Sequence, residues 1–244
     1  MELLCSNRNF NNNRYRFRYR NNVGEHKIMA NHVYFNISVE GLDEEQWAAL
    51  FKTEERTNKD YEGKDYTFTD LVEIEHQPFM ENVDKEFDDD NFLMNAYNWY
   101  CDNVGAKWCH IEEWENHGYI SGYSAWSTPY EMVNNLMEYA SNKYQIELSA
   151  KMTYEDEFRN FIGVDYFESY KDEDDKEYYC SHTEEYVDGN DLNRVVEEHF
   201  DCDLEDEEFN WGDEIKNQYG EMQVPSEFAD DVVYEFFETG EWTR

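Results

Sequence analysis

The chain has 244 residues, of which 58 are acidic and 20 basic, so its formal net charge is −38. A protein of this charge repels nucleic acid and anionic membranes and attracts basic protein surfaces. Aromatic residues make up 18% of the chain, and disordered acidic segments seldom carry so many. We therefore expect a folded protein with an acidic surface that is a monomer or a salt-dependent dimer.

The first 28 residues have the opposite charge, with six basic and two acidic side chains. Arginine alternates with tyrosine and phenylalanine over residues 14–20. Three interpretations stay open: an arm that holds single-stranded nucleic acid by charge and stacking, a disordered arm or translated leader that ends before Met29, and a basic arm that folds back onto the acidic body. We favour the second.

The five cysteines are odd in number and widely scattered, and no run approaches the length of about 18–20 apolar residues that a membrane span needs. No apolar signal segment precedes a cleavage site. We expect a cytoplasmic protein with free thiols and no membrane partner.

Hydrophobic periodicity predicts the first elements. Val33, Phe35, Ile37 and Val39 alternate with polar residues and predict a half-buried strand from His32. Asp43 is placed to cap a short helix that carries Trp47, Leu50 and Phe51, and a loop follows over residues 53–65. A second helix is expected after residues 88–90, with Gly105 as its stop.

Strands at 107–113 and 119–126 follow, joined by a turn at 116–118. Thr128 as N-cap, Pro129 at the first helical position and Glu131 as a capping-box partner predict a helix whose buried stripe is Met132, Val133, Leu136, Met137 and Ala140. Alternation at Ile146, Leu148, Ala150 and Met152 predicts another strand, and residues 158–166 an edge strand.

This order is βαββαβ with one extra helix. We expect an α+β protein whose residues 29–167 form a ferredoxin-like domain, an antiparallel sheet with helices on one face. Residues 168–244 are nearly twice as dense in charge and carry two apolar stripes of helical spacing. They predict a small acidic, mainly helical domain, with Ser226 capping its last helix and Gly240 ending it.

Four short motifs carry a family resemblance. They are N-V-G-A-K-W at 103–108, S-A-W-S-T-P at 124–129, Tyr154-Glu155, and Phe161-Ile162-Gly163. Over about residues 30–167 they resemble the YubB-like ferredoxin-fold family of phage and plasmid proteins, whose pattern is N-W-G-T-K-W, T-A-W-S-P-P, Y-x-E and F-x-G. The chain departs from that pattern at Val104, Ala106, Ser124 and Thr128.

The resemblance implies a ferredoxin-like fold and a mobile-element origin, but no reaction. The family motif residues in this chain are Lys107, Trp108, Ala125, Trp126, Ser127 and Pro129. We favour a structural role for the two tryptophans, packed across neighbouring strands. Lys107, between them, is the residue to test for ligand contact.

No motif indicates catalysis. The seven histidines form no HExxH pattern, and no Walker loop or GxSxG is present. Cys109-His110, Cys180 with His182, and His199 with Cys202 are soft-ligand pairs, but none repeats as a paired CxxC. Asp201, Asp203 and Glu205 have the spacing of a calcium loop without its turn glycine. We expect no enzyme, no metal and no cofactor.

The acidity favours imitation of DNA. Spread evenly, the charge has about half the surface density of duplex DNA, so a mimic must gather its acids on one face. The candidate partner-binding acids are Asp172, Glu173, Asp174, Asp175, Glu184, Glu185, Glu197, Glu198, Asp203, Glu205, Asp206, Glu207, Glu208, Asp230 and Asp231.

We rank three hypotheses. The first is a phage-type inhibitor that acts in the host cytoplasm. It binds a basic host protein of the DNA-binding class and blocks it. This hypothesis rests on analogy with known acidic mimics of DNA. The second is a structural or assembly module that contacts partners through aromatics such as Trp108, Trp126 or Trp242, with the acids as a solvating surface. The third is a metal protein or enzyme that uses Cys109 and His110.

Overall fold

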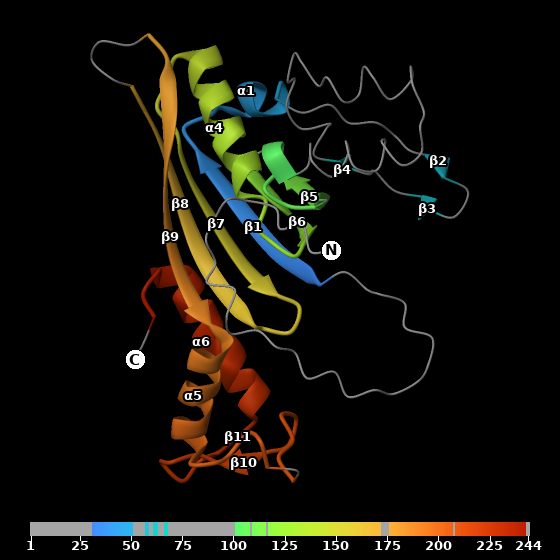
Figure 1. Ribbon diagram of the computed structural model, residues 1–244, viewed down its shortest axis with the longest axis vertical. Coiled ribbons are helices and arrows are strands. Elements are labelled where there is room, and N and C mark those ends of the chain that lie inside the picture. The colour runs from blue at the N-terminus through green and yellow to red at the C-terminus, as the bar shows by residue number, and fades with distance from the viewer. Residues whose placement is uncertain are drawn as a thin grey trace.

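An antiparallel sheet runs along the molecule (Figure 1). The computed structural model describes residues 31–50, 57–58, 61–62, 66–67, 101–107, 109–115, 117–171, 176–206 and 208–242. The sheet has the strand order β4-β5-β6-β1-β7-β8-β9, and each neighbouring pair is antiparallel. Its strands are β1 (His32–Glu40), β4 (Tyr66–Thr67), β5 (Cys109–Glu115), β6 (Tyr119–Ala125), β7 (Ser149–Asp156), β8 (Phe161–Lys171) and β9 (Tyr178–Asp188).

Helices and two short hairpins complete the described residues. The helices are α1 (Glu44–Ala48), α4 (Tyr130–Tyr144), α5 (Gly189–Phe200) and α6 (Pro225–Thr239). The hairpins are β2 (Thr57–Asn58) with β3 (Tyr61–Glu62), and β10 (Ile215–Lys216) with β11 (Met222–Gln223). The prediction of an α+β protein built on an antiparallel sheet is confirmed.

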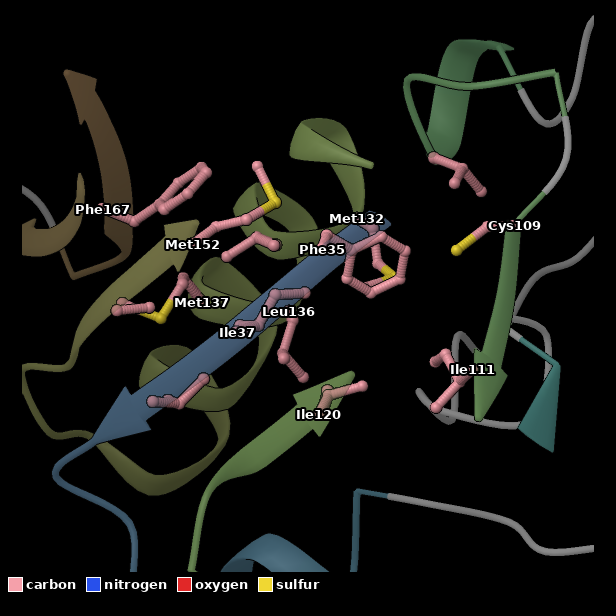
Figure 2. Close-up of a cluster of buried hydrophobic side chains, with 14 of the residues drawn as sticks. Phe35, Ile37, Cys109, Ile111, Ile120, Met132, Leu136, Met137, Met152 and Phe167 are labelled. Carbon is pink, nitrogen blue, oxygen red and sulfur yellow. The ribbon is translucent and has the colours of Figure 1, made fainter. Parts of the chain in front are cut away.

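The first hydrophobic core lies between α4 and one face of the sheet (Figure 2). Because successive side chains of a strand point to opposite faces, Phe35 and Ile37 of β1 share this face with Ile120, Met152 and Phe167 of neighbouring strands. The predicted stripe of α4 is buried against them. The alternation expected in β1 is confirmed.

The second core lies on the opposite face of β8 and β9. Ile162, Val164 and Val187 alternate out of phase with Phe167 and pack with the apolar stripes of α5 and α6. Those stripes include Leu192, Val196, Phe200, Val232, Val233 and Phe236. The sheet therefore has α4 on one face and α5 and α6 on the other. The expectation of helices on one face concerned residues 29–167, and α5 and α6 lie beyond that range.

Some local details match the predictions. Asp43 accepts a hydrogen bond from the Gln46 amide and closes a capping box at α1. Gly118 has a φ of +82° in the turn between β5 and β6, and Gly240, with a φ of +72°, ends α6. Each of these turns uses the left-handed region that glycine enters at little cost.

The starts of α4 and α6 and the position of β8 differ from the predictions. Pro129 occupies the N-cap of α4 and no side chain caps that helix, so Thr128 is not the cap. Val224, followed by Pro225, precedes α6 in place of Ser226. The expected edge strand is β8, which continues to Lys171 and lies between β7 and β9.

The predicted division into domains at 167/168 falls inside β8, and β9 beyond it belongs to the same sheet. The division itself, and the separate helical domain, stay predictions. Residues 1–28 and the part of the expected second helix up to residue 100 lie outside the described residues. Residues 101–103 are helical, and Gly105, the predicted stop, has a φ of +88°.

Candidate functional site: the acidic C-terminal surface

Most of the described candidate acids belong to residues 189–242, which we call the acidic unit. It comprises α5, α6 and the chain between them, and forms the lower part of the molecule in Figure 1. Its 54 residues contain 18 acidic side chains and two basic ones, Arg194 and Lys216. The second core organises the unit by burying the apolar stripes of α5 and α6, and most of the carboxylates lie on the outer sides of these helices and in the chain between them.

The exposed side of α6 is a row of carboxylates. Ala229, Val232, Val233 and Phe236 are buried on its inner side. The outer side carries five exposed acids, Glu227, Asp230, Asp231, Glu235 and Glu238, together with the exposed Tyr234. The twelve residues from Glu227 to Glu238 are separated by eleven helical rises, about 16 Å, which gives about one carboxylate per 3–4 Å of helix axis. One strand of duplex DNA carries one charge per about 3.4 Å.

The loop after α5 is shaped by its own acids. Asp203 Oδ1 accepts a hydrogen bond from the Glu205 amide at 2.9 Å, and Asp206 Oδ1 accepts one from the Glu208 amide at 3.0 Å. Glu197 Oε1 accepts from the Leu204 amide at 3.2 Å. These local turns hold the loop and keep the carboxylates at the surface, as Asx turns do elsewhere.

The remaining candidate acids lie elsewhere or have other partners. Glu184 and Glu185 are adjacent on β9 and so point to opposite faces of the sheet. Asp230 forms an ion pair with Arg159, which lies between β7 and β8. Residues 172–175 and Glu207 lie outside the described residues. The acidic unit thus contains Glu197, Glu198, Asp203, Glu205, Asp206, Glu208, Asp230 and Asp231.

The family motif residues meet at the entry to α4. Ser127 Oγ donates to the Gly105 carbonyl at 2.6 Å, and Ser124 Oγ donates to the Ser127 carbonyl at 2.6 Å. The bond from Ser127 joins the motif segments 103–108 and 124–129, and the bond from Ser124 lies within the second segment. Lys107 is exposed, and Ala125 and Pro129 are buried. Trp108 lies outside the described residues.

Trp126 differs from the expectation of cross-strand packing. It follows the last residue of β6, its side chain is 58% exposed, and its φ is +72°. A bulky residue in the left-handed region is strained. The tryptophan therefore adds little to the core, and its position is held by a hydrogen bond from its amide to the Asn31 carbonyl at 3.0 Å.

Sequence reasoning missed a buried polar cluster beside the N-terminus of α4. Asp165 on β8 is 1% exposed, and its Oδ2 lies 3.0 Å from His182 Nε2, within ion-pair distance but not aligned as a hydrogen bond. Tyr154 Oη lies within hydrogen-bond distance of two carboxylates, Glu184 Oε1 at 3.0 Å and Asp165 Oδ1 at 3.4 Å, and its single proton is donated to one of them at a time. The imidazole stacks with the Phe167 ring at a centroid distance of 4.8 Å and with the Tyr130 ring at 5.8 Å. The sequence did contain a signal for this cluster. Asp165 lies at an alternate position between Gly163 and Phe167, so it is an acid on the same face of the strand as a large apolar side chain.

The cysteine–histidine pairs do not form a larger ligand group. No set of three or more His, Cys, Asp or Glu side chains in the described residues is arranged to hold a metal ion. Burial raises the pKa of the Cys109 thiol, and burial together with Glu138 raises that of Cys180 to about 12. Cys109, Cys180 and Cys202 are free, but Cys101 is disulfide-bonded, which corrects the expectation of free thiols at that position.

Comparison with protein-family models, with curated proteins and with solved structures finds no match. Among the helices of the described residues, none combines the length and the apolar character needed to cross a membrane.

Proposed function

We propose that this chain is a non-enzymatic acidic protein that binds a basic host protein, of the DNA-binding class, by presenting carboxylates in place of phosphates. The observation that carries the proposal is the carboxylate row of α6, whose charge per length is close to that of one DNA strand. The two basic side chains of the acidic unit are too few to neutralise its 18 acids. The field of such a surface steers basic partners toward it.

The proposed fold beneath this surface is ferredoxin-like. In a βαββαβ unit of that class, the strands would be β1, β5, β6 and β7, with α4 as the second helix. Their order in the sheet is β5-β6-β1-β7, with β1 and β6 in the middle. This order and the joined motif segments support membership of the YubB-like family and an origin in a phage or plasmid. On this proposal, β8 and β9 extend the sheet and carry the acidic unit.

A second candidate function is an assembly module without DNA mimicry. The exposed and strained Trp126 favours it, because an exposed tryptophan is an effective anchor for a protein partner. Binding through Trp126 would bury apolar surface and change little with salt. Binding through α6 would weaken steeply as salt rises.

The test uses the tagged full chain to capture proteins from host lysate, with and without competing duplex DNA. We expect a basic DNA-binding protein that duplex DNA displaces. The triple variant Glu227→Gln, Asp231→Asn, Glu235→Gln should weaken its capture at least about tenfold, since each lost charge contact contributes to steering and affinity.

The matched control is Glu40→Gln, Glu45→Gln, Glu147→Gln, which removes the same charge from exposed positions outside the acidic unit. It should retain nearly full capture. If the two triple variants lose capture of the partner equally, the loss comes from the change in net charge alone. That result would contradict a role for the carboxylate row of α6. A partner that duplex DNA leaves bound and that Trp126→Ala releases would favour the assembly module.

A further inference from the structure

A second acidic surface lies on β9, beyond the end of α4. The ring of Tyr130, the first residue of α4, stacks with His182 at a centroid distance of 5.8 Å. Glu184, Tyr186 and Asp188 follow at alternate positions along β9, so they share the face of His182 and continue past the helix. We call these three residues with Phe161 the β9 face.

The β9 face combines carboxylates with aromatic rings. Phe161 stacks with Tyr186 at a centroid distance of 6.0 Å and meets Tyr154 edge-on at 6.2 Å. Tyr186 is 44% exposed, and Glu184 is exposed. Such a surface suits arginine, whose guanidinium pairs with carboxylates and stacks on aromatic rings.

We propose that residues 14–20 of the same chain bind in extended form across the β9 face. This segment reads Arg-Tyr-Arg-Phe-Arg-Tyr-Arg. In an extended chain, alternate side chains share one side and repeat every 6–7 Å or so, which places all four arginines together. Glu184, Tyr186 and Asp188 repeat with the same period on β9. The arginines face Glu184 and Asp188, with Tyr186 between.

The connection is long enough. Asn31 precedes β1, and its side-chain amide donates to Asp156 at the end of β7. Phe161, at the start of β8, pairs in register with Asp188 at the end of β9. These residues lie at one end of the sheet, where β1 and β9 are three strand spacings, about 14 Å, apart. Residues 21–30 can span up to about 33 Å.

The tether makes weak contacts effective. Exposed arginine–carboxylate pairs contribute little individually. A segment joined by a short linker has an effective local concentration in the millimolar range, which favours docking within one chain over pairing between chains. The inference does not rest on the proposed function, because α6 packs on the opposite face of β8 and remains available.

The experiment measures trypsin cleavage after Arg14, Arg16, Arg18 and Arg20 in the folded full chain at low salt. A synthetic peptide of residues 8–24 gives the rate for the undocked segment. We expect cleavage of the full chain to be at least about tenfold slower than that of the peptide, and the protection to disappear as salt rises.

The variant Glu184→Gln, Asp188→Asn should restore cleavage to near the peptide rate. Asp188 caps α5 through the Asn190 amide, and asparagine keeps that cap, so the fold is retained. The control Glu198→Gln, Asp231→Asn makes the same charge change on the acidic unit and should stay protected.

Three outcomes would overturn the proposal. The first is a wild-type chain cleaved as fast as the peptide. The second is a Glu184→Gln, Asp188→Asn variant as protected as the wild type or the control. The third is protection that appears only after single-stranded oligonucleotide is added, which would assign the segment to nucleic-acid binding instead.

Discussion

His182 Nε2 and Asp165 Oδ2 lie 3.0 Å apart on the neighbouring strands β9 and β8, at the edge of the first core. The carboxylate is 1% exposed, while 18% of the histidine side chain is exposed. Removing the imidazole would leave the buried carboxylate of Asp165 without this neighbour, which is costly for a desolvated acid. The contact therefore connects β9 to the first core. Its effect on stability comes mainly from the cost of leaving the Asp165 carboxylate buried without a neighbour, and less from the attraction between the two side chains.

We expect His182→Gln to lower the free energy of unfolding by about 2–3 kcal/mol, a value below that of a fully buried pair because the histidine is partly exposed. Adding Asp165→Asn should cost less in this background than in the wild type, with a coupling of about 1–2 kcal/mol. Urea unfolding of the wild type, the two single variants and the double variant measures this coupling free energy.

The control is His117→Gln, whose partner Glu44 lies 3.6 Å away at an exposed site. It should change stability by less than about 0.5 kcal/mol. Strict additivity of the two substitutions at 165 and 182 would show that the pair is not coupled.

Lys151 of β7 holds the C-terminus of α6. Its Nζ donates to the Phe237 carbonyl and, at 3.4 Å, to the Glu238 carbonyl. Carbonyls in the last turn of a helix lack partners within the helix and favour a cation. We expect Lys151→Met to cost about 1–2 kcal/mol and to speed amide exchange in the last turn of α6.

Lys143→Met is the control for that substitution, since Lys143 lies over the exposed edge of α4 near the Tyr139 and Tyr144 rings. Its exchange in α6 should match the wild type. Unchanged exchange in Lys151→Met would mean that the apolar stripe alone positions α6.

Local periodicity could predict much of this fold, because it depends on residues that are near in sequence. The alternation from Val33 to Val39 and the apolar stripe of α4 needed no tertiary information. β9 could not be read in this way. Its side chains from Ser181 to Tyr186 are mostly exposed, and its strand conformation comes from pairing with β8 along its whole length.

The site was predictable in content but not in arrangement. The acids of 197–208 and 230–231 are evident in the sequence, yet only the packing of α5 and α6 places them on one unit. Glu184 stood in the same candidate list but lies on the sheet, bonded to Tyr154. The strain at Trp126 could not be foreseen, because the hydrogen bonds around it join residues far apart in sequence: the Trp126 amide donates to the Asn31 carbonyl, and Ser127 Oγ donates to the Gly105 carbonyl.

The buried thiol of Cys109 should make stability fall in alkali. Burial raises its pKa, whereas the thiol of the unfolded chain ionises near 9.0. A raised folded-state pKa contributes stability that is fully present below the unfolded pKa and is lost as pH rises above it. Between pH 8 and pH 10 the loss from this one thiol is about 1.4 kcal/mol.

We therefore expect the free energy of unfolding of Cys109→Ala to fall less between pH 8 and pH 10 than that of the wild type. Ile111→Val, on the same strand, changes packing without removing a titrating group and should keep the wild-type slope. Parallel pH slopes for wild type and Cys109→Ala would contradict the assignment of this loss to the thiol.

Replacing Trp126 separates backbone strain from side-chain packing. With φ at +72° and a largely exposed ring, the residue has a conformation that costs non-glycine residues about 1–2 kcal/mol. Trp126→Gly should consequently be more stable than Trp126→Ala by about 1 kcal/mol, measured by urea unfolding.

Trp211 provides the comparison, because its ring is also exposed and its φ lies outside the left-handed region. There the order should not favour glycine, since glycine loses more conformational entropy on folding than alanine does. If Trp126→Ala equals or exceeds Trp126→Gly in stability, the backbone at 126 relaxes when the ring is removed. The strain would then come from the ring's own contacts, and the exposed tryptophan would no longer stand as a residue held in place for a partner.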